Sequence, residues 1–147
     1  MATMRIYLDT CCWNRLFDLP QTGRVRLESQ AVTEIVARGE SGAVTLIWSE
    51  VLDYEISNNP HREVATALAL LSRICTERVP ISQTSRNRAE ILTQQGVGAF
   101  DALHIALAEE SRCDIFLTVD DKLLRRMEHS TTTIQVISPL TLIMQSI

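Results

Sequence analysis

Short apolar runs alternate with longer amphipathic segments along the chain. Continuous apolar runs are typical of strands buried on both faces of a parallel sheet, whereas apolar positions that recur every three or four residues indicate helices. Strands and helices that follow one another in this way predict a parallel sheet with helices on both faces. The predicted strands are 5–10, 43–48, 115–118 and 134–137, and 79–81 is a shorter extended piece.

Polar caps and helix-breaking residues divide the segments between these strands. Thr22 and Ser49 each precede an amphipathic segment, and Gly39 ends the first of them. Residues 11–21 are predicted to form a loop. The predicted helices are 22–38, 49–57, 62–75, 82–95, 101–111 and 121–127, and a short apolar tail follows Pro139.

The composition predicts one compact domain over residues 1–147. Of the 147 residues 46% are hydrophobic, which is enough apolar material for a sizeable core. No apolar run is long enough to span a bilayer and the first residues lack the pattern of a signal peptide, so the expected location is the cytoplasm. The four cysteines agree with this, because their spacing matches neither a disulfide framework nor a zinc site. The net charge of −4 argues against bulk electrostatic coating of nucleic acid and leaves room for a local basic rim.

Four acidic residues share one predicted location. Asp9 and Asp120 follow the ends of two predicted strands, and Asp101 stands at the start of a helix. Glu55 lies four residues after Val51 in the helix that follows the second strand, so the two share an inward-facing side of that helix. Because the carboxyl ends of parallel strands lie at one edge of a sheet, the four carboxylates are expected to meet there.

Each acid also has an ordinary explanation. Asp9, Asp101 and Asp120 stand where helix-capping residues are common, and Glu55 can reach solvent from the edge of its apolar stripe. Together, however, four carboxylates would repel one another unless a divalent cation were bound. Carboxylate ligands without partnering histidines or thiolates indicate Mg²⁺ or Mn²⁺ rather than zinc. Such a site activates water and stabilises charge on a phosphodiester, which is the chemistry of a nuclease.

These acidic motifs resemble those of PIN domains, a family of metal-dependent ribonucleases that includes the VapC toxins of bacterial toxin–antitoxin systems. The resemblance covers nearly the whole chain in family order. It rests on 8–10 (Leu-Asp-Thr), on Ser49 with Glu55, on 101–106 (Asp-Ala-Leu-His-Ile-Ala) and on 117–120 (Leu-Thr-Val-Asp).

The resemblance implies a three-layer α/β/α sandwich with a mostly parallel central sheet. It also implies an endoribonuclease that uses Mg²⁺ or Mn²⁺. Thr118 would support the site through its hydroxyl, and Asp121 is a candidate to share the role of Asp120. Similarity to VapC further implies a homodimer and a small antitoxin protein that covers the acidic groove. The residues that would hold the metal or orient the attacking water are Asp9, Glu55, Asp101 and Asp120.

The first loop departs from the family pattern. Many members have an asparagine two positions after the first aspartate, where this chain has Cys11, and the nearest amide is Asn14. This departure bears on substrate preference more than on metal binding. Basic residues near the acidic motifs are candidates for contacts with substrate phosphates, although they also fit an ordinary charged surface: Arg15, Lys122, Arg125 and Arg126.

Two alternatives stay open. A phosphatase or receiver-like domain phosphorylated on Asp9 fits poorly, because Cys11 replaces the second aspartate of haloacid-dehalogenase phosphatases and Lys122 lies inside a helix. A non-catalytic PIN-like module that binds RNA or a protein is the other, and the presence of all four acids favours the enzyme over it. His104 is expected to be a hydrogen-bonded histidine at the edge of the core rather than a catalytic group.

Overall fold

Five parallel strands form one sheet in the order β3-β2-β1-β4-β5. The structure is a computed structural model that describes residues 2–19 and 21–146. Residues of β1 and β2 form the centre of the core: Tyr7, Leu8 and Ile47 are fully buried. The strands are β1 (Met4–Leu8), β2 (Val44–Ser49), β3 (Glu77–Val79), β4 (Ile115–Leu117) and β5 (Gln135–Ile137).

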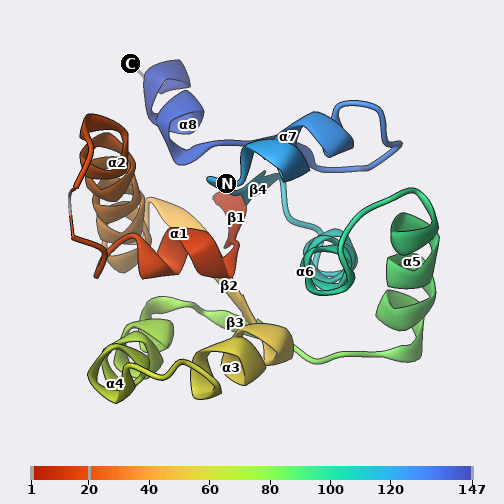
Figure 1. Ribbon diagram of the computed structural model, residues 1–147, viewed down its shortest axis with the longest axis horizontal. Helices are drawn as coiled ribbons and strands as arrows, with labels where there is room; N and C mark the ends of the chain where they lie inside the picture. Colours follow the sequence, from red (N-terminus) through yellow and green to blue (C-terminus); the bar gives the residue numbers. More distant parts are fainter. Residues whose placement is uncertain (1, 20, 147) are drawn as a thin grey trace.

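Helices cover both faces of this sheet (Figure 1). On one face α2 (Gly23–Glu40) lies beside α8 (Pro139–Gln145), and on the other α5 (Gln83–Gln94) packs along α6 (Ala99–Glu110). This arrangement confirms the predicted three-layer α/β/α sandwich. The other α-helices are α1 (Thr10–Asn14), α3 (Glu50–Ser57), α4 (Arg62–Leu71) and α7 (Asp121–Met127). No helix in the described ranges combines the length and the apolar character that crossing a membrane requires.

The segment predicted as a loop after β1 begins with the helix α1. Asp9 caps this helix, since its Oδ1 accepts a hydrogen bond from the backbone N–H of Cys11 at 2.8 Å. Cys12 and Trp13 are fully buried. The rings of Trp13 and Trp48 pack edge to face, with their centroids 5.1 Å apart. The prediction of a loop was therefore wrong for residues 11–14, and Thr10, predicted to end the strand, begins the helix. Tertiary burial and a side-chain cap stabilise a helix too short to form alone.

Four other elements differ from the predicted ones. The helix predicted over 62–75 ends at Leu71 and continues as a single 3₁₀ turn. The edge strand β3 spans 77–79, so it overlaps the predicted extended piece 79–81 only at Val79. α6 begins at Ala99 with Gly98 as its N-cap, so Asp101 lies in the first turn and does not cap the helix. The apolar tail forms α8, whose N-terminus is capped by Ser138.

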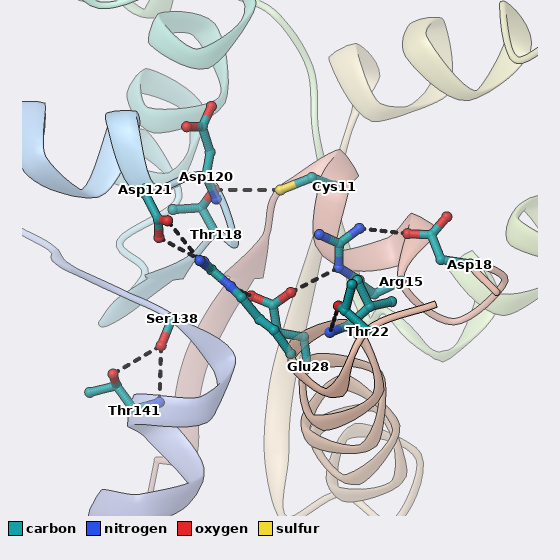
Figure 2. A network of polar contacts seen from close by, with 12 residues as sticks. Cys11, Arg15, Asp18, Thr22, Glu28, Thr118, Asp120, Asp121, Ser138 and Thr141 are labelled. Carbon is teal, nitrogen blue, oxygen red and sulfur yellow. Dashed lines mark hydrogen bonds and ion pairs between the residues drawn. The ribbon is translucent and has the colours of Figure 1, made fainter. Parts of the chain in front are cut away.

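A buried carboxylate joins three helices beside the sheet. Only 2% of the side chain of Glu28 in α2 is exposed. Its Oε1 lies 3.1 Å from Nε of Arg15 at the end of α1, and its Oε2 lies 3.2 Å from Nε of Arg24. Arg24 also donates to both carboxylate oxygens of Asp121 at the start of α7 (Figure 2). A buried charge is tolerated only when it is paired in this way. The Glu28 network therefore connects α1, α2 and α7.

We expect Glu28→Gln to lower the free energy of unfolding by about 1–3 kcal/mol, because two guanidiniums lose their buried counter-charge. The matched control is Glu34→Gln, which breaks the exposed pair with Arg38 and is expected to cost less than about 0.5 kcal/mol. Chemical denaturation of both variants measures the difference. Equal effects of the two changes would mean that the buried network does not stabilise the fold.

Candidate active site

The parallel sheet places the ends of β1, β2 and β4 at one edge. Asp9 follows β1 directly, Asp120 follows β4 and caps α7, and Glu55 lies in α3, which begins where β2 ends. Asp101, in the first turn of α6, lines a hollow of about 230 Å³ together with Asp120. The four acids thus come from four different elements.

The electrostatics of Asp101 show that these acids influence one another. Its pKa is raised to about 6, first because the side chain is partly buried and then because of the negative charges of Asp9 and Asp120. Glu55 adds a smaller effect in the same direction, and the interaction with His104 partly opposes these effects. A carboxylic acid with a pKa near neutrality and other carboxylates beside it is typical of functional sites.

Thr118 connects two of the acids. Its hydroxyl donates a hydrogen bond to Oδ2 of the buried Asp9 at 2.7 Å and accepts one from the backbone N–H of Asp120 at 3.1 Å. The sulfur of Cys11 lies 3.5 Å from the same hydroxyl oxygen. The orientation of Asp9 is therefore determined from both sides, by Thr118 and by the backbone of Cys11.

Glu55 is held by a network that reaches into the core. Its Oε1 accepts a hydrogen bond from the hydroxyl of Thr10 at 2.8 Å and contacts Nε2 of the buried His104. Nδ1 of His104 lies 2.6 Å from the hydroxyl of Tyr7, which in turn lies 2.6 Å from Oγ of Ser49. Burial tends to raise the pKa of Glu55, but the hydrogen bond and charge interaction with His104 and the hydrogen bond from Thr10 together outweigh burial and lower the pKa below its ordinary value.

The partners of this network were only partly foreseen. His104 was expected to be a hydrogen-bonded residue at the edge of the core, and the structure pairs it with Glu55. Tyr7 was not singled out, and Thr10 was named only as part of the motif at 8–10. The available signal was a tyrosine between the apolar Ile6 and Leu8, because a buried phenol hydroxyl needs a partner.

The acids have free oxygens that a cation can use. Within 2–19 and 21–146, Asp101 accepts no hydrogen bond, and neither does Oε2 of Glu55 or Oδ2 of Asp120. In the same ranges no three His, Cys, Asp or Glu side chains are arranged so that they could hold a metal ion as they stand. Mutual repulsion between the carboxylates favours their separation, and a bound cation would remove that repulsion. The donor set, hard carboxylate oxygens, fits Mg²⁺ or Mn²⁺.

The predicted supporting and basic residues fall into two groups. Lys122 and Arg126 line the same hollow as Asp101 and Asp120, and Arg125 lines the adjacent one. The other two have partners that compete with their predicted roles. Arg15 pairs with Glu28 and Asp18, and Asp121 is occupied by Arg24, which lowers the pKa of the Asp121 carboxyl. Figure 2 shows the neighbouring carboxylates of Asp120 and Asp121 pointing in opposite directions.

The raised pKa of Asp101 predicts a pH dependence of stability. The folded protein holds this proton more tightly than the unfolded chain, so ionisation of Asp101 destabilises the fold as the pH rises from about 4 to about 6. We therefore expect Asp101→Asn to melt at a higher temperature than the wild type at pH 7.5, with the difference vanishing below pH 4. Thermal melts at both pH values test this, with Glu90→Gln as the control for loss of an exposed charge. A wild type at least as stable as Asp101→Asn at pH 7.5 would contradict the crowding of the acids.

Comparison with known proteins gives one family. A family model described as "PIN domain" matches residues 6–129. No curated protein sequence matches the chain.

Solved structures share the fold at low sequence identity. FitAcB from Neisseria gonorrhoeae is 13% identical with a TM-score of 0.60, and covers 91% of this chain and 97% of its own. VapBC2 from Rickettsia felis, bound to a DNA fragment from its promoter, is 13% identical with a TM-score of 0.59, over 90% and 97% of the two chains. VapC20 from Mycobacterium tuberculosis, a toxin that cleaves the sarcin–ricin loop, is 16% identical with a TM-score of 0.61, over 88% and 98%. The chain belongs to the PIN domain family.

Proposed function

We propose that this protein is a metal-dependent endoribonuclease and the toxin of a VapBC-type toxin–antitoxin pair. The observation that carries the proposal is the raised pKa of Asp101 beside the charges of Asp9, Asp120 and Glu55. Carboxylates kept together at the carboxyl edge of a parallel sheet, at a cost in stability, indicate a functional site. Membership of the PIN family and the fold shared with VapBC complexes support the same reaction.

Mg²⁺ or Mn²⁺ is the proposed cofactor. Asp9, Asp101 and Asp120 would hold the ion through carboxylate oxygens, and Glu55 would bind it or orient the attacking water. When bound, the ion supplies Lewis-acid stabilisation of the phosphoryl charge and lowers the pKa of water.

The protein's own side chains orient the reacting groups. Thr118 donates to Oδ2 of Asp9, which keeps the remaining lone pairs of that carboxylate in one direction. Thr10 and His104 hold Oε1 of Glu55, so that Oε2 is left to accept a hydrogen bond from the attacking water. Asp101 lines one hollow together with Asp120, where its carboxylate would hold the ion. In the same hollow Lys122 and Arg126 offer positive charge to the substrate phosphate.

The proposed protein partners are an antitoxin and a second copy of the chain. A hollow of about 660 Å³ beside Thr10 and Glu55 is lined on its apolar side by Phe17, Leu19 and Val64. An antitoxin segment that filled this hollow would cover Glu55.

A second apolar surface fits the homodimer. The exposed rings of Tyr54 and Phe100 stack with their centroids 5.8 Å apart. Exposed aromatic side chains of this kind are typical of interfaces.

A non-catalytic PIN-like module is the alternative. It is favoured by the hydrogen bonds that already occupy Asp9 and Glu55, and by the absence of a ready-made metal cluster among the described residues. Binding of Mn²⁺ separates the two functions. Isothermal titration is expected to show that the wild type binds Mn²⁺ and that Glu55→Gln binds it more weakly, whereas no binding at all would favour the module.

Asp9→Asn and Asp101→Asn are each expected to reduce RNA cleavage at least about 100-fold, because each removes a charged ligand that stabilises the transition state. Cleavage of a single-stranded RNA with Mg²⁺ or Mn²⁺ measures this, and circular dichroism checks that the fold is retained. Asp114→Asn, which changes an aspartate that precedes β4 at the opposite edge of the sheet, is the control and should cleave like the wild type. Retained cleavage in either site variant would refute the proposal.

A further inference from the structure

Three cations next to the acidic site have no ion-pair partner in the described part of the chain. They are Lys122, Arg125 and Arg126, all exposed on α7. Arginines on other elements, such as Arg24 and Arg88, instead hold carboxylates. In a protein of net charge −4, a group of unpaired cations on one helix is a local concentration of positive potential.

These side chains line two hollows that share Lys122 and Arg126. The smaller one, of about 230 Å³, also contains Asp101 and Asp120. The larger one, of about 560 Å³, has the size of a small ligand site and contains no acidic residue. We call it the basic hollow, and its lining residues are Gln95, Lys122, Arg125, Arg126, His129 and Ser130.

A glycine leaves room for the guanidinium of Arg126, which lines both hollows. Gly96 has a φ of +96°, and a Cβ atom there would lie 2.8 Å from Nη1 of Arg126. Any other residue would be strained by that backbone conformation and would also displace the guanidinium. The loop before α6, which carries Gly96, and α7 are therefore fitted to each other at this point.

We propose that the basic hollow binds phosphates of the RNA strand adjacent to the phosphate that is cleaved. This rests on the proposed ribonuclease function. Guanidiniums bind phosphate oxygens through two parallel hydrogen bonds, and Gln95 and Ser130 add neutral donors for phosphate or ribose oxygens. The acids of the smaller hollow repel a phosphate that has no metal ion beside it. The phosphates next to the cleaved one are therefore bound most favourably in the basic hollow. A strand that enters there passes Lys122 and Arg126 on its way to Asp101 and Asp120.

The test measures RNA affinity without cleavage. A fluorescein-labelled single-stranded RNA of mixed sequence, 12 nucleotides long, is titrated with protein in EDTA at several salt concentrations, and anisotropy gives Kd. Arg125→Gln and Arg126→Gln should each weaken binding several-fold and reduce the slope of log Kd against log salt by about 0.7, the value for one lost phosphate contact on a single strand. The triple Lys122→Gln/Arg125→Gln/Arg126→Gln variant should reduce the slope by about 2.

Arg73→Gln is the matched control, since Arg73 is exposed and lies in the 3₁₀ turn that precedes β3. It changes the net charge by the same amount and should leave Kd and slope nearly unchanged. Equal effects of Arg73→Gln and Arg126→Gln, or an unchanged slope in the triple variant, would overturn the proposal. Because no metal or cleavage enters this measurement, its outcome is separate from that of the ribonuclease assay.

A different observation carries a second inference. The line of contacts from Ser49 through Tyr7 and His104 ends on Glu55, and its first three side chains are buried, with 2% or less exposed. We infer that His104 is a positioning residue that fixes the orientation of Glu55 for metal or water. Side chains that hold a metal ligand from behind are typically worth about 10- to 100-fold in metal affinity or activity.

His104→Leu is expected to weaken Mn²⁺ binding about 10- to 100-fold in isothermal titration. His104→Gln should restore much of the affinity, because its side-chain amide can donate to Glu55 from a position near Nε2. A purely structural role would instead lower the melting temperature of both variants and leave Mn²⁺ affinity unchanged, which would refute the inference. In the background of Glu55→Gln, His104→Leu should have no further effect on Mn²⁺ affinity. A wild type that binds no Mn²⁺ would refute the proposed function as well.

Discussion

The parallel direction of the five strands is the constraint on which the rest of the structure depends. It brings the ends of β1, β2 and β4 to one edge, although about a hundred residues separate Asp9 from Asp120 along the chain. Carboxylates that meet there repel one another, and the raised pKa of Asp101 reflects that repulsion together with partial burial. The folded protein would be more stable without the negative charge of Asp101 at this edge. A charge that is kept at a cost in stability is expected where function requires it.

Positive charge and hydrogen-bond donors around this edge are distributed unequally. His104 and Thr10 hold Glu55, Thr118 holds Asp9, and α7 takes Asp120 as its cap. Asp101 has no such partner among the described residues and is therefore where the excess negative charge is concentrated. Farther along α7 the sign reverses, because the cations of the basic hollow form no ion pair within the described ranges. The negative charge at the acidic site and the positive charge beside it on α7 suit a metal ion and a phosphate backbone that bind next to each other.

Local sequence patterns were sufficient to predict the features that depend on local structure. Apolar runs located the central strands, and the positions of Asp9 and Asp120 just after two of them pointed to the edge where they lie. α1 was missed because its formation depends on burial of Trp13 against Trp48, a contact between distant segments. The edge strand β3 was too short to identify without its pairing to β2. The contact of Tyr7 with His104 spans 97 positions, and no periodicity reveals a contact of that kind.

The central claim is that acids from four elements bind one divalent cation site. The most direct test is the anomalous difference density of Mn²⁺ in crystals of the protein grown or soaked with that ion. The account predicts a peak between the carboxylates of Asp9, Asp101 and Asp120, with Glu55 bound directly or through water. Mn²⁺ bound elsewhere, or Asp9 and Asp101 facing away from each other in a Mn²⁺-saturated crystal, would contradict it.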